Sequence, residues 1–453
     1  EGRTVADRQG GPMKPITRRT ALAGTGAALA GALASCAPPN PGSVNAEATI
    51  PPSTDRVNLT YWAWVKDLQK VADIFNKSQD RIHVEASWIP GGGSGGYAKI
   101  LSAVAAGGGP DIAQVELRSV PEFALAGALV DLSRYGIVKD KFDPGAFAQA
   151  QVGESVWAVP QDTGPVANFY NREVLEGELG LTPPSTWDEF REVAGAVKDA
   201  GKTIFTLDPS DGSYFVMWAM QAGATWFKPE GDGWIINMTD EKSLKVAEFW
   251  DGILADNLVG TGYGAFSTPW MAATGDDKVL STISGSWSDA LIEAVPGAKG
   301  KWAVAPMPTW GDGYASGAHG GSSAAILSTS KHPAEALEFC TWMCTSPEGI
   351  DAMIENCGIG WSPSADYIGQ SRTQPSGFFS GQNYNEEVMV PMAEGQNLEW
   401  TWAPLMQRFM DVVGTGMTKA INGEQPLVDL LAVTQKDITE IMQGMGLNAE
   451  EAR

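Results

Sequence analysis

The chain has 453 residues, of which 43% are hydrophobic, and 54 acidic against 31 basic residues give it a formal net charge of −23 at pH 7. This length predicts two or three domains, each large enough to bury a core. So acidic a chain repels nucleic acid and anionic lipid, which excludes nucleic acid as a partner. With three histidines, none of them paired, and no Cys-x-x-Cys motif, we expect no metal site and no cofactor.

The first predicted element is a secretory signal that ends at Cys36. Arg18 and Arg19 precede a weakly apolar, charge-free run at 21–34, which is shorter than the roughly 20 residues that span a bilayer. The arginine pair is typical of twin-arginine signals. Leu33-Ala34-Ser35-Cys36 resembles the bacterial lipobox, in which the cysteine is lipidated and becomes the new N-terminus. We therefore expect residues 1–35 to be a signal peptide; the alternative is a buried first helix with a core cysteine.

Lipid on Cys36 predicts an exported protein that is anchored to the outer face of the cytoplasmic membrane. Residues 36–55 are rich in proline and have little to bury, so we expect a flexible tether there. No further membrane-spanning segment is predicted, and the membrane is a partner only through the lipid.

Strands and helices alternate after the tether, which predicts an α/β protein with parallel sheets. The first series has strands at 57–62, 82–86 and 111–115, and helices that begin at 68 and 97. A second series includes a strand near 157–160, helices at 187–200 and 242–254, and strands at 202–207 and 279–284. From residue 333 onward helices dominate, at 333–344, 347–356, 403–420 and 426–443.

The glycine-rich run at 91–96 matches two catalytic motifs, but neither fits its context. It satisfies a dinucleotide-binding fingerprint, which a run of glycines matches by chance. With Ser94 it also satisfies the hydrolase motif Gly-x-Ser-x-Gly, yet His319-Gly320-Gly321, which resembles an oxyanion loop, follows Ser94 instead of preceding it. We expect a mobile loop whose free amides hydrogen-bond a ligand.

Three cysteines follow Cys36 in the chain: Cys340, Cys344 and Cys357. If 334–344 and 347–357 form antiparallel helices, Cys357 lies nearer to Cys340 than to Cys344. We predict a Cys340–Cys357 disulfide, with three unpaired buried thiols as the alternative.

Tryptophans at strand ends and in turns point to a carbohydrate ligand. An indole stacks on the apolar face of a pyranose, whose hydroxyls need directional polar partners. Ligands of open α/β sheets bind beyond the carboxyl ends of the strands. The tryptophans in such places are Trp62, Trp64, Trp287, Trp361, Trp400 and Trp402, and the polar residues are Lys66, Asp67, Glu116, Arg118 and Asp162. By contrast, Trp187, Trp218, Trp250 and Trp342 occur in helical patterns, where core packing is expected.

A set of short motifs in a fixed order carries a resemblance to a known family. They are Pro110-Asp111-Ile112, the segments 126–132, 157–160, 169–172 and 184–190, Gly285-Ser286-Trp287, and the segments 336–339 and 345–349. In these motifs, from about Asn58 to Ile441, the chain resembles the bacterial extracellular solute-binding proteins of ABC importers, in the branch that includes maltose-binding protein.

The resemblance implies a two-lobed fold of the periplasmic-binding-protein type, with two α/β lobes joined by several crossings. We expect residues 56–162 with 322–365 to form the N-terminal lobe and 163–321 with 366–453 the C-terminal lobe. It also implies a monomeric binding protein, not an enzyme, that captures a di- or oligosaccharide by closure of its cleft and delivers it to ABC permease subunits.

Carried over by position, the resemblance places Trp287 on the family's sugar-stacking tryptophan. Ser213 and Tyr214 fall where a glutamate and a tyrosine contact maltose; the acid is missing here, which puts maltose in doubt. The candidate ligand-binding residues are Trp64, Lys66, Asp67, Glu116, Arg118, Asp162, Ser213, Tyr214, Trp287, Gly321, Trp361 and Trp400.

Two alternatives stay open. A secreted glycoside hydrolase would use a carboxylate pair such as Asp276-Asp277 or Glu386-Glu387, although adjacent acids are commonly solvated surface. The same binding fold would also suit a peptide or a polar metabolite.

Overall fold

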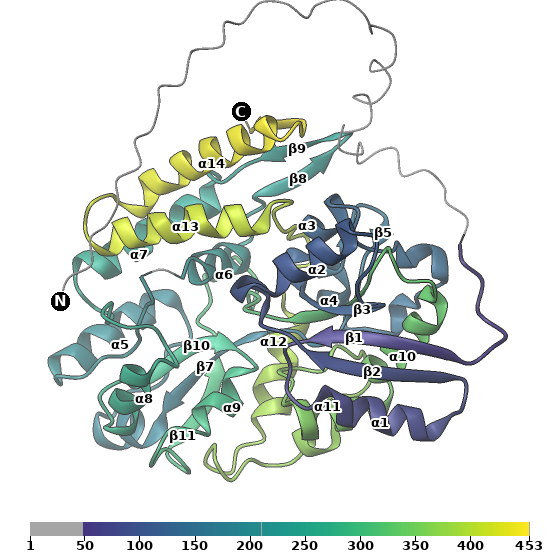
Figure 1. The fold of residues 1–453 in the computed structure, drawn as a ribbon. Helices are drawn as coiled ribbons and strands as arrows, with labels where there is room; N and C mark the ends of the chain where they lie inside the picture. The colour runs from purple at the N-terminus through teal and green to yellow at the C-terminus, as the bar shows by residue number, and fades with distance from the viewer. Residues whose placement is uncertain (1–48, 210, 453) are drawn as a thin grey trace, which may run out of the picture. The chain divides into compact units, whose positions relative to one another are not determined.

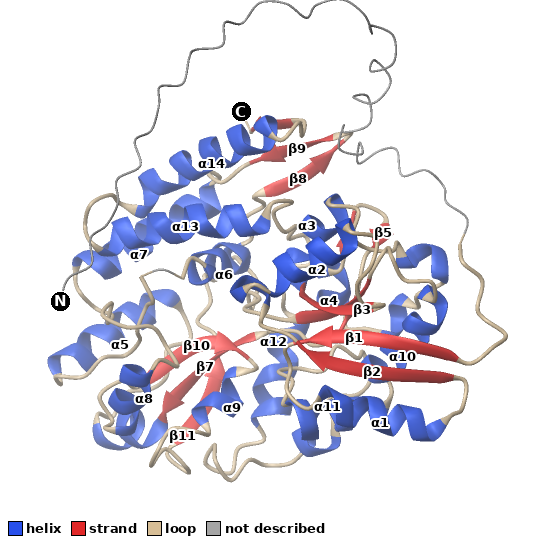
Figure 2. Cartoon of the chain, in the orientation of Figure 1, coloured by secondary structure: helices blue, strands red, loops and turns tan. Residues whose placement is uncertain are grey.

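The computed structural model describes residues 49–209 and 211–452, so the predicted signal segment, Cys36 and most of the tether lie outside the described residues. Within those ranges, helices and strands alternate along most of the chain (Figures 1 and 2). No helix in this part of the chain is both long and apolar enough to cross a membrane.

The first sheet has five strands in the order β2-β1-β3-β12-β6, which come from two separate parts of the sequence. The first three strands are parallel, as predicted, and β12 runs antiparallel to β3 and to β6. In β1 alternate residues are buried, because successive side chains of a strand point to opposite faces. The strands are β1 Val57–Ala63, β2 Ile82–Trp88, β3 Ile112–Glu116, β6 Val159–Pro160 and β12 Ser322–Ile326.

Helices with one apolar face cover this sheet. In α1 the buried residues Leu68, Val71, Ala72 and Phe75 recur at helical spacing and pack in one cluster with β1 and β2. The helices are α1 Leu68–Ser78, α2 Gly96–Ala105, α3 Val120–Leu125, α4 Pro144–Gln149, α10 Pro333–Thr345 and α11 Pro347–Cys357. The short strands β4 Gln151–Val152 and β5 Ser155–Val156 pair with each other.

Two further sheets have three strands each, in the orders β10-β7-β11 and β13-β9-β8. The first is wholly antiparallel, which differs from the predicted parallel pairing. The predicted strand at 202–207 forms only isolated bridges, from Thr203 to Val279 and from Thr206 to Gly260, and both bridges are parallel. The strands are β7 Val166–Asn171, β8 Phe227–Glu230, β9 Gly233–Ile236, β10 Ser281–Gly285, β11 Trp302–Pro306 and β13 Ala449–Glu451.

Aromatic side chains fill the core beside these two sheets. Trp218 and Trp250 stack with ring centroids 3.6 Å apart, and Trp187 packs edge-on against Trp250 at 5.6 Å. These three are buried and Trp342 is half-buried against the first core, as their helical positions predict. The helices here are α5 Trp187–Asp199, α6 Ser213–Ala222, α7 Glu241–Ala255, α8 Thr268–Gly275, α9 Ser288–Ile292, α12 Val390–Glu394, α13 Met406–Ile421 and α14 Leu427–Gly444.

The predicted Cys340–Cys357 disulfide is wrong, because both residues and Cys344 are free, buried thiols. Cys340 and Cys344 lie one turn apart on α10, Cys357 ends α11, and all three pack in the apolar cluster with β1. Burial raises the pKa of Cys357 to about 12. The thiols therefore behave as small apolar side chains.

Candidate functional site

The candidate site is built where β3 ends and β12 begins. Glu116, the last residue of β3, pairs with Ser322, the first residue of β12, in the antiparallel ladder. Gly321 has φ +102°, and its carbonyl accepts a hydrogen bond from the Leu117 N–H at 3.1 Å. The positive φ favours glycine at this position, and a Cβ there would also make a tight contact, 3.2 Å from Leu117 Cδ1. The structure thus brings together two predicted site residues that lie far apart in sequence.

Arg118 forms an ion pair with Glu116 at this point. Its guanidinium lies 3.0 Å from Glu116 Oε1, and the two side chains keep 32% and 23% of their surface exposed. Tyr97, in the first turn of α2, donates its hydroxyl to Glu116 Oε2 at 2.9 Å and accepts from the Glu116 N–H at 3.1 Å. Burial and the Glu116 charge raise the pKa of Tyr97, which keeps it a neutral donor. The pair therefore offers a fixed carboxylate and guanidinium that still reach solvent.

Trp64 joins this group through Tyr97. It follows β1, is half-buried, and its ring centroid lies 6.0 Å from that of Tyr97 in an edge-to-face arrangement. The N–H groups of Trp64 and Val65 donate to Gln114 Oε1 at 3.0 and 3.1 Å, while Gln114 Nε2 donates to Ser322 Oγ at 3.0 Å. One buried amide therefore ties the loop after β1 to β3 and β12.

Asp162 is held by the start of β12. Its carboxylate accepts a hydrogen bond from the Ser322 N–H. Burial raises the pKa of Asp162 to about 6, and the charge of Glu116 raises it further. Hydrogen bonds from the Ser322 and Gly360 N–H groups act in the opposite direction and lower it. Asp162 therefore changes its charge near neutral pH.

Trp287 directly precedes α9, two residues after the end of β10, and is half-buried. Its indole Nε1 donates to the His319 carbonyl at 2.7 Å. A Cβ at Gly285 would lie 2.5 Å from this Nε1, and one at Gly320 would lie 2.7 Å from it. The two glycines therefore let the indole lie directly against the backbone, and they fix the orientation of a ring that remains partly exposed.

His319 anchors a polar network beside Trp287. Its Nδ1 lies 3.1 Å from Ser284 Oγ and its Nε2 lies 3.0 Å from Ser213 Oγ, while the Ser213 hydroxyl donates to Asp211. Because Ser213 gives its one proton to Asp211, we assign Nε2 as the donor to Ser213 and Nδ1 as the acceptor from Ser284. In this tautomer His319 is no general base for Ser213, so the serine is not an activated nucleophile.

Electrostatic interactions connect the two groups of residues. Burial lowers the pKa of His319 to about 4, Asp211 and Glu116 act in the opposite direction, and Arg118 lowers it further. The pKa of Arg118 is raised, because Glu116, Tyr97 and Asp211 together outweigh the effect of its burial. The backbone joins the same two groups, because the Gly321 carbonyl, two residues after His319, accepts from the Leu117 N–H at 3.1 Å.

The remaining predicted residues have other surroundings. Lys66 and Asp67 are exposed in the turn before α1, where Asp67 has φ +58° and pairs with Lys70 at 3.3 Å. Tyr214 is buried, with its ring centroid 5.0 Å from that of His319. Trp361 and Trp400 pack in the larger core cluster, where the Trp400 ring lies 5.3 Å from Trp226. Ligand contact by these residues stays a prediction, and the core packing of the two tryptophans does not support it.

Two residues that hold this site together were missed as candidates. Tyr97 opens the helix after the glycine loop, and His319 directly precedes Gly320 and Gly321. Both residues adjoin glycines that the sequence analysis had singled out. Their position next to these glycines is the feature by which they could have been predicted.

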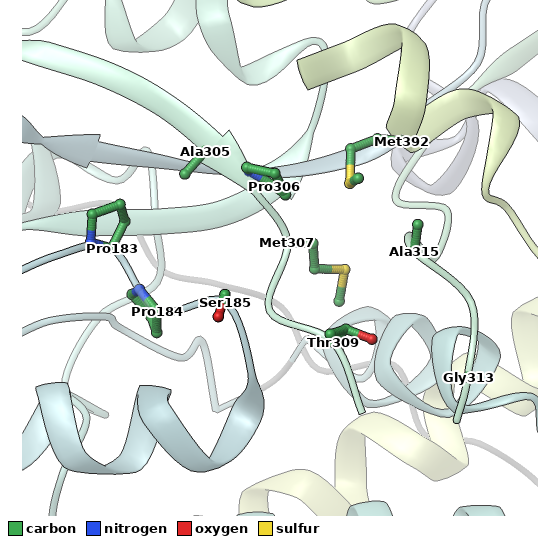
Figure 3. A pocket seen from close by; sticks show the side chains of 10 residues that line it. All are labelled: Pro183, Pro184, Ser185, Ala305, Pro306, Met307, Thr309, Gly313, Ala315 and Met392. Carbon is green, nitrogen blue, oxygen red and sulfur yellow. The ribbon is translucent and has the colours of Figure 1, made fainter. Parts of the chain in front are cut away.

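The described pockets lie away from these residues. Figure 3 shows a pocket of about 440 Å³ whose lining is mostly apolar, with Pro184, Pro306, Met307 and Met392 among its walls. A second pocket, of about 790 Å³, lies between the segment at 136–141 and α10. Neither is lined by a candidate site residue. Within residues 49–209 and 211–452, no three His, Cys, Asp or Glu side chains are grouped to hold a metal ion.

Comparisons with known proteins show the family and the fold of the chain. A sequence profile described as "Bacterial extracellular solute-binding protein" matches residues 59–349. A lactose-binding protein of Rhizobium radiobacter is 28% identical over 261 residues, which are 55% of this chain and 61% of that protein. The chain thus matches about three fifths of the length of this curated relative.

Two solved structures match most of the chain. One is the ABC transporter associated binding protein from B. animalis subsp. lactis Bl-04 in complex with β-1,6-galactobiose, with a TM-score of 0.74, 28% identity, and coverage of 88% of this chain and 100% of that one. The other is the galacto-N-biose/lacto-N-biose I-binding protein of the ABC transporter from Bifidobacterium longum in complex with lacto-N-biose, with a TM-score of 0.77, 26% identity and the same coverage. These matches confirm the predicted two-lobed α/β fold.

Proposed function

The chain belongs to the bacterial extracellular solute-binding proteins, and from this we propose that it captures a neutral di- or oligosaccharide and delivers it to the permease subunits of an ABC importer. It acts by binding and closure, without breaking or forming a bond in its ligand. The observation that carries this proposal is the half-buried indole of Trp287, which the His319 carbonyl and two glycines hold against the segment 319–321. The Gly321 carbonyl of that segment accepts from the N–H of Leu117, which lies between Glu116 and Arg118.

The chemistry of these groups suits a sugar. An indole offers an apolar face to the C–H groups of a pyranose, while a carboxylate accepts from hydroxyls and a guanidinium donates to them. Because Glu116 and Arg118 are already paired, they need no charged ligand to balance them. Neutral carbohydrates are also what the relatives are named for: lactose, β-1,6-galactobiose and lacto-N-biose.

Closure follows from the distribution of these residues between two lobes, which we place at 56–162 with 322–365 and at 163–321 with 366–453. In support, the strands of the first sheet come from 57–160 and 322–326, and those of the other two sheets from 166–306 and 449–451. Glu116 and Arg118 then belong to one lobe, and Trp287 and His319 to the other. A ligand that touches both groups binds the closed form better and shifts the population toward it.

The place of action is part of the proposal. Cys36, after a twin-arginine-like signal, would be lipidated and hold the protein at the outer face of the cytoplasmic membrane. A monomer is sufficient for the mechanism, because one chain supplies both groups of binding residues.

Calorimetric titration with lactose, β-1,6-galactobiose and lacto-N-biose tests the binding function. We expect at least one of these sugars to bind, and the Trp287→Ala variant to bind it far more weakly. Trp342→Ala is the matched control, because Trp342 is also half-buried but packs against Phe75 at 5.0 Å in the other core. Equal affinity of the Trp287→Ala variant, or release of reducing ends from the sugars, would contradict the proposal.

A further inference from the structure

One tryptophan of the described chain is mostly exposed. Trp88 leaves 69% of its surface in contact with solvent, whereas the other tryptophans are buried or half-buried. Its neighbours along the chain add little apolar side-chain surface: Ser87 is polar, Gly91 and Gly93 have no side chains, and only Pro90 is both apolar and exposed. Protein interfaces use contiguous apolar surface, so a single exposed ring on such a segment favours a small ligand that stacks on it.

The position of Trp88 is the edge of the sheet where ligands are expected. It is the last residue of β2 and lies beside Ala63, the last residue of β1, in the parallel ladder; both strands end together in Figure 2. The Ile89 N–H donates to the Ala63 carbonyl at 2.9 Å, which continues the pairing. Adjacent strands are about 4.8 Å apart, so the Trp88 backbone lies within roughly 9 Å of that of Trp64, which follows Ala63.

The loop after Trp88 connects it to the candidate site. A Cβ at Gly91 would lie 3.9 Å from the ring of Trp64, and one at Gly92 would collide with the ring of Tyr97. The Tyr97 hydroxyl in turn contacts Glu116 at 2.9 Å. A series of direct contacts therefore leads from the Trp88 loop through two aromatic rings to the Glu116–Arg118 pair.

From this we propose that Trp88 is an outer stacking surface for an oligosaccharide that extends beyond the sugar units held by Trp287 and Glu116. The inference rests on the proposed carbohydrate binding and adds that the protein recognises ligand length. A disaccharide fills the inner site alone, while a longer neutral glycan also lays a pyranose on the exposed indole face of Trp88.

Affinity as a function of chain length tests this proposal. Calorimetric titrations would use β-1,6-linked galactobiose, galactotriose and galactotetraose with the wild-type protein and with Trp88→Ala. We expect the variant to bind galactobiose as the wild type does, and to lose about fivefold to tenfold in affinity for galactotetraose, the range of one aromatic stacking contact. Trp88→Phe should retain most of the affinity for the longer sugar.

Two controls separate this effect from misfolding and from failure of the inner site. Val138→Ala changes another exposed apolar residue, 51% exposed, and should alter neither the binding nor the unfolding midpoint. If Trp287→Ala loses every sugar and Trp88→Ala loses none, the outer site is refuted and the proposed function stands. If the wild-type protein binds none of a broad set of neutral oligosaccharides, both are refuted together.

Discussion

Two groups of tryptophans show how the same side chain serves different purposes in this molecule. Trp218 and Trp250 stack face to face at 3.6 Å, are fully buried, and have indole N–H groups without a hydrogen-bond partner. Trp287 is half-buried, lies against glycine backbone, and gives its N–H to the His319 carbonyl at 2.7 Å. The first pair forms a hydrophobic core, whereas Trp287 is oriented by a polar contact and leaves part of its ring accessible.

The comparison teaches that the position of a tryptophan relative to its secondary structure indicates its role. The core tryptophans lie within α6 and α7, where helix faces pack together. Trp287 and Trp64 come just after strands, at the edge of a sheet where the chain turns. Mutations in the two groups should therefore affect different measurements, stability in one and ligand affinity in the other.

Trp250→Ala should have the largest effect, on stability. Removing a fully buried indole leaves a cavity and eliminates the stack with Trp218, so we expect the free energy of unfolding to fall by about 3–5 kcal/mol. Urea unfolding followed by circular dichroism would measure this. Normal stability of the variant would contradict a core role, and the folded fraction should bind ligand with unchanged affinity.

The pH dependence of stability should reflect His319 beside Trp287. Its pKa is about 4 in the folded protein, against an ordinary value of about 6.5 in the unfolded chain. Between these values the unfolded chain binds a proton that the folded protein resists, so the free energy of unfolding should fall as the pH decreases from 6.5 toward 4. The expected total is roughly 3 kcal/mol.

Urea titrations at several pH values would measure this decline, with His319→Gln as the control. The variant cannot take up the proton and should show a flatter dependence over the same range. An identical decline in both proteins would assign the effect to other groups.

Trp287→Ala should cost affinity more than stability. If Trp287 stacks on the ligand as proposed, the loss of this surface predicts a change of about 2 kcal/mol in binding free energy, or roughly 30-fold in Kd. The free energy of unfolding should change less than in Trp250→Ala, because the side chain is only half-buried. If Trp287→Ala and Trp250→Ala lowered the free energy of unfolding by equal amounts, the distinction between the core tryptophans and Trp287 would be contradicted.

Asp162→Asn should show the opposite dependence on pH. The folded pKa of Asp162 is about 6, raised from 3.8 by burial, so the charged form is disfavoured in the folded state and the Asp162 contribution to stability falls as the pH rises from about 4 to 6. The neutral amide should remove this decline. The difference between wild-type and variant unfolding curves at pH 4.5 and pH 7 would measure it.

The sequence predicted local features of the fold better than contacts between distant segments. The parallel strands β1, β2 and β3 follow one another with helices between them, so their periodicity was readable. The antiparallel sheet pairs β7 with strands more than a hundred residues away. A local sequence pattern does not identify so distant a pairing partner. The segment at 202–207 has the pattern of a strand, although it forms only two isolated bridges.

Contacts between distant segments also limited the prediction of the site. Glu116, Arg118 and Trp287 were predicted because they lie at or just after strand ends, and the structure gives them polar or backbone partners. Trp361 and Trp400 occupy similar positions in the sequence, but neighbouring segments bury them to 3% and 4% exposure. His319 was missed because its partners Ser213 and Ser284 lie 106 and 35 residues away.

The three free thiols of the described chain have a consequence for how the protein matures. These cores form without oxidation, because Cys340, Cys344 and Cys357 are buried as reduced side chains. Folding of these cores therefore depends on no disulfide among the three residues, whether the compartment is reducing or oxidising. Reductants at the cell surface would find no bridge among these three residues to cleave.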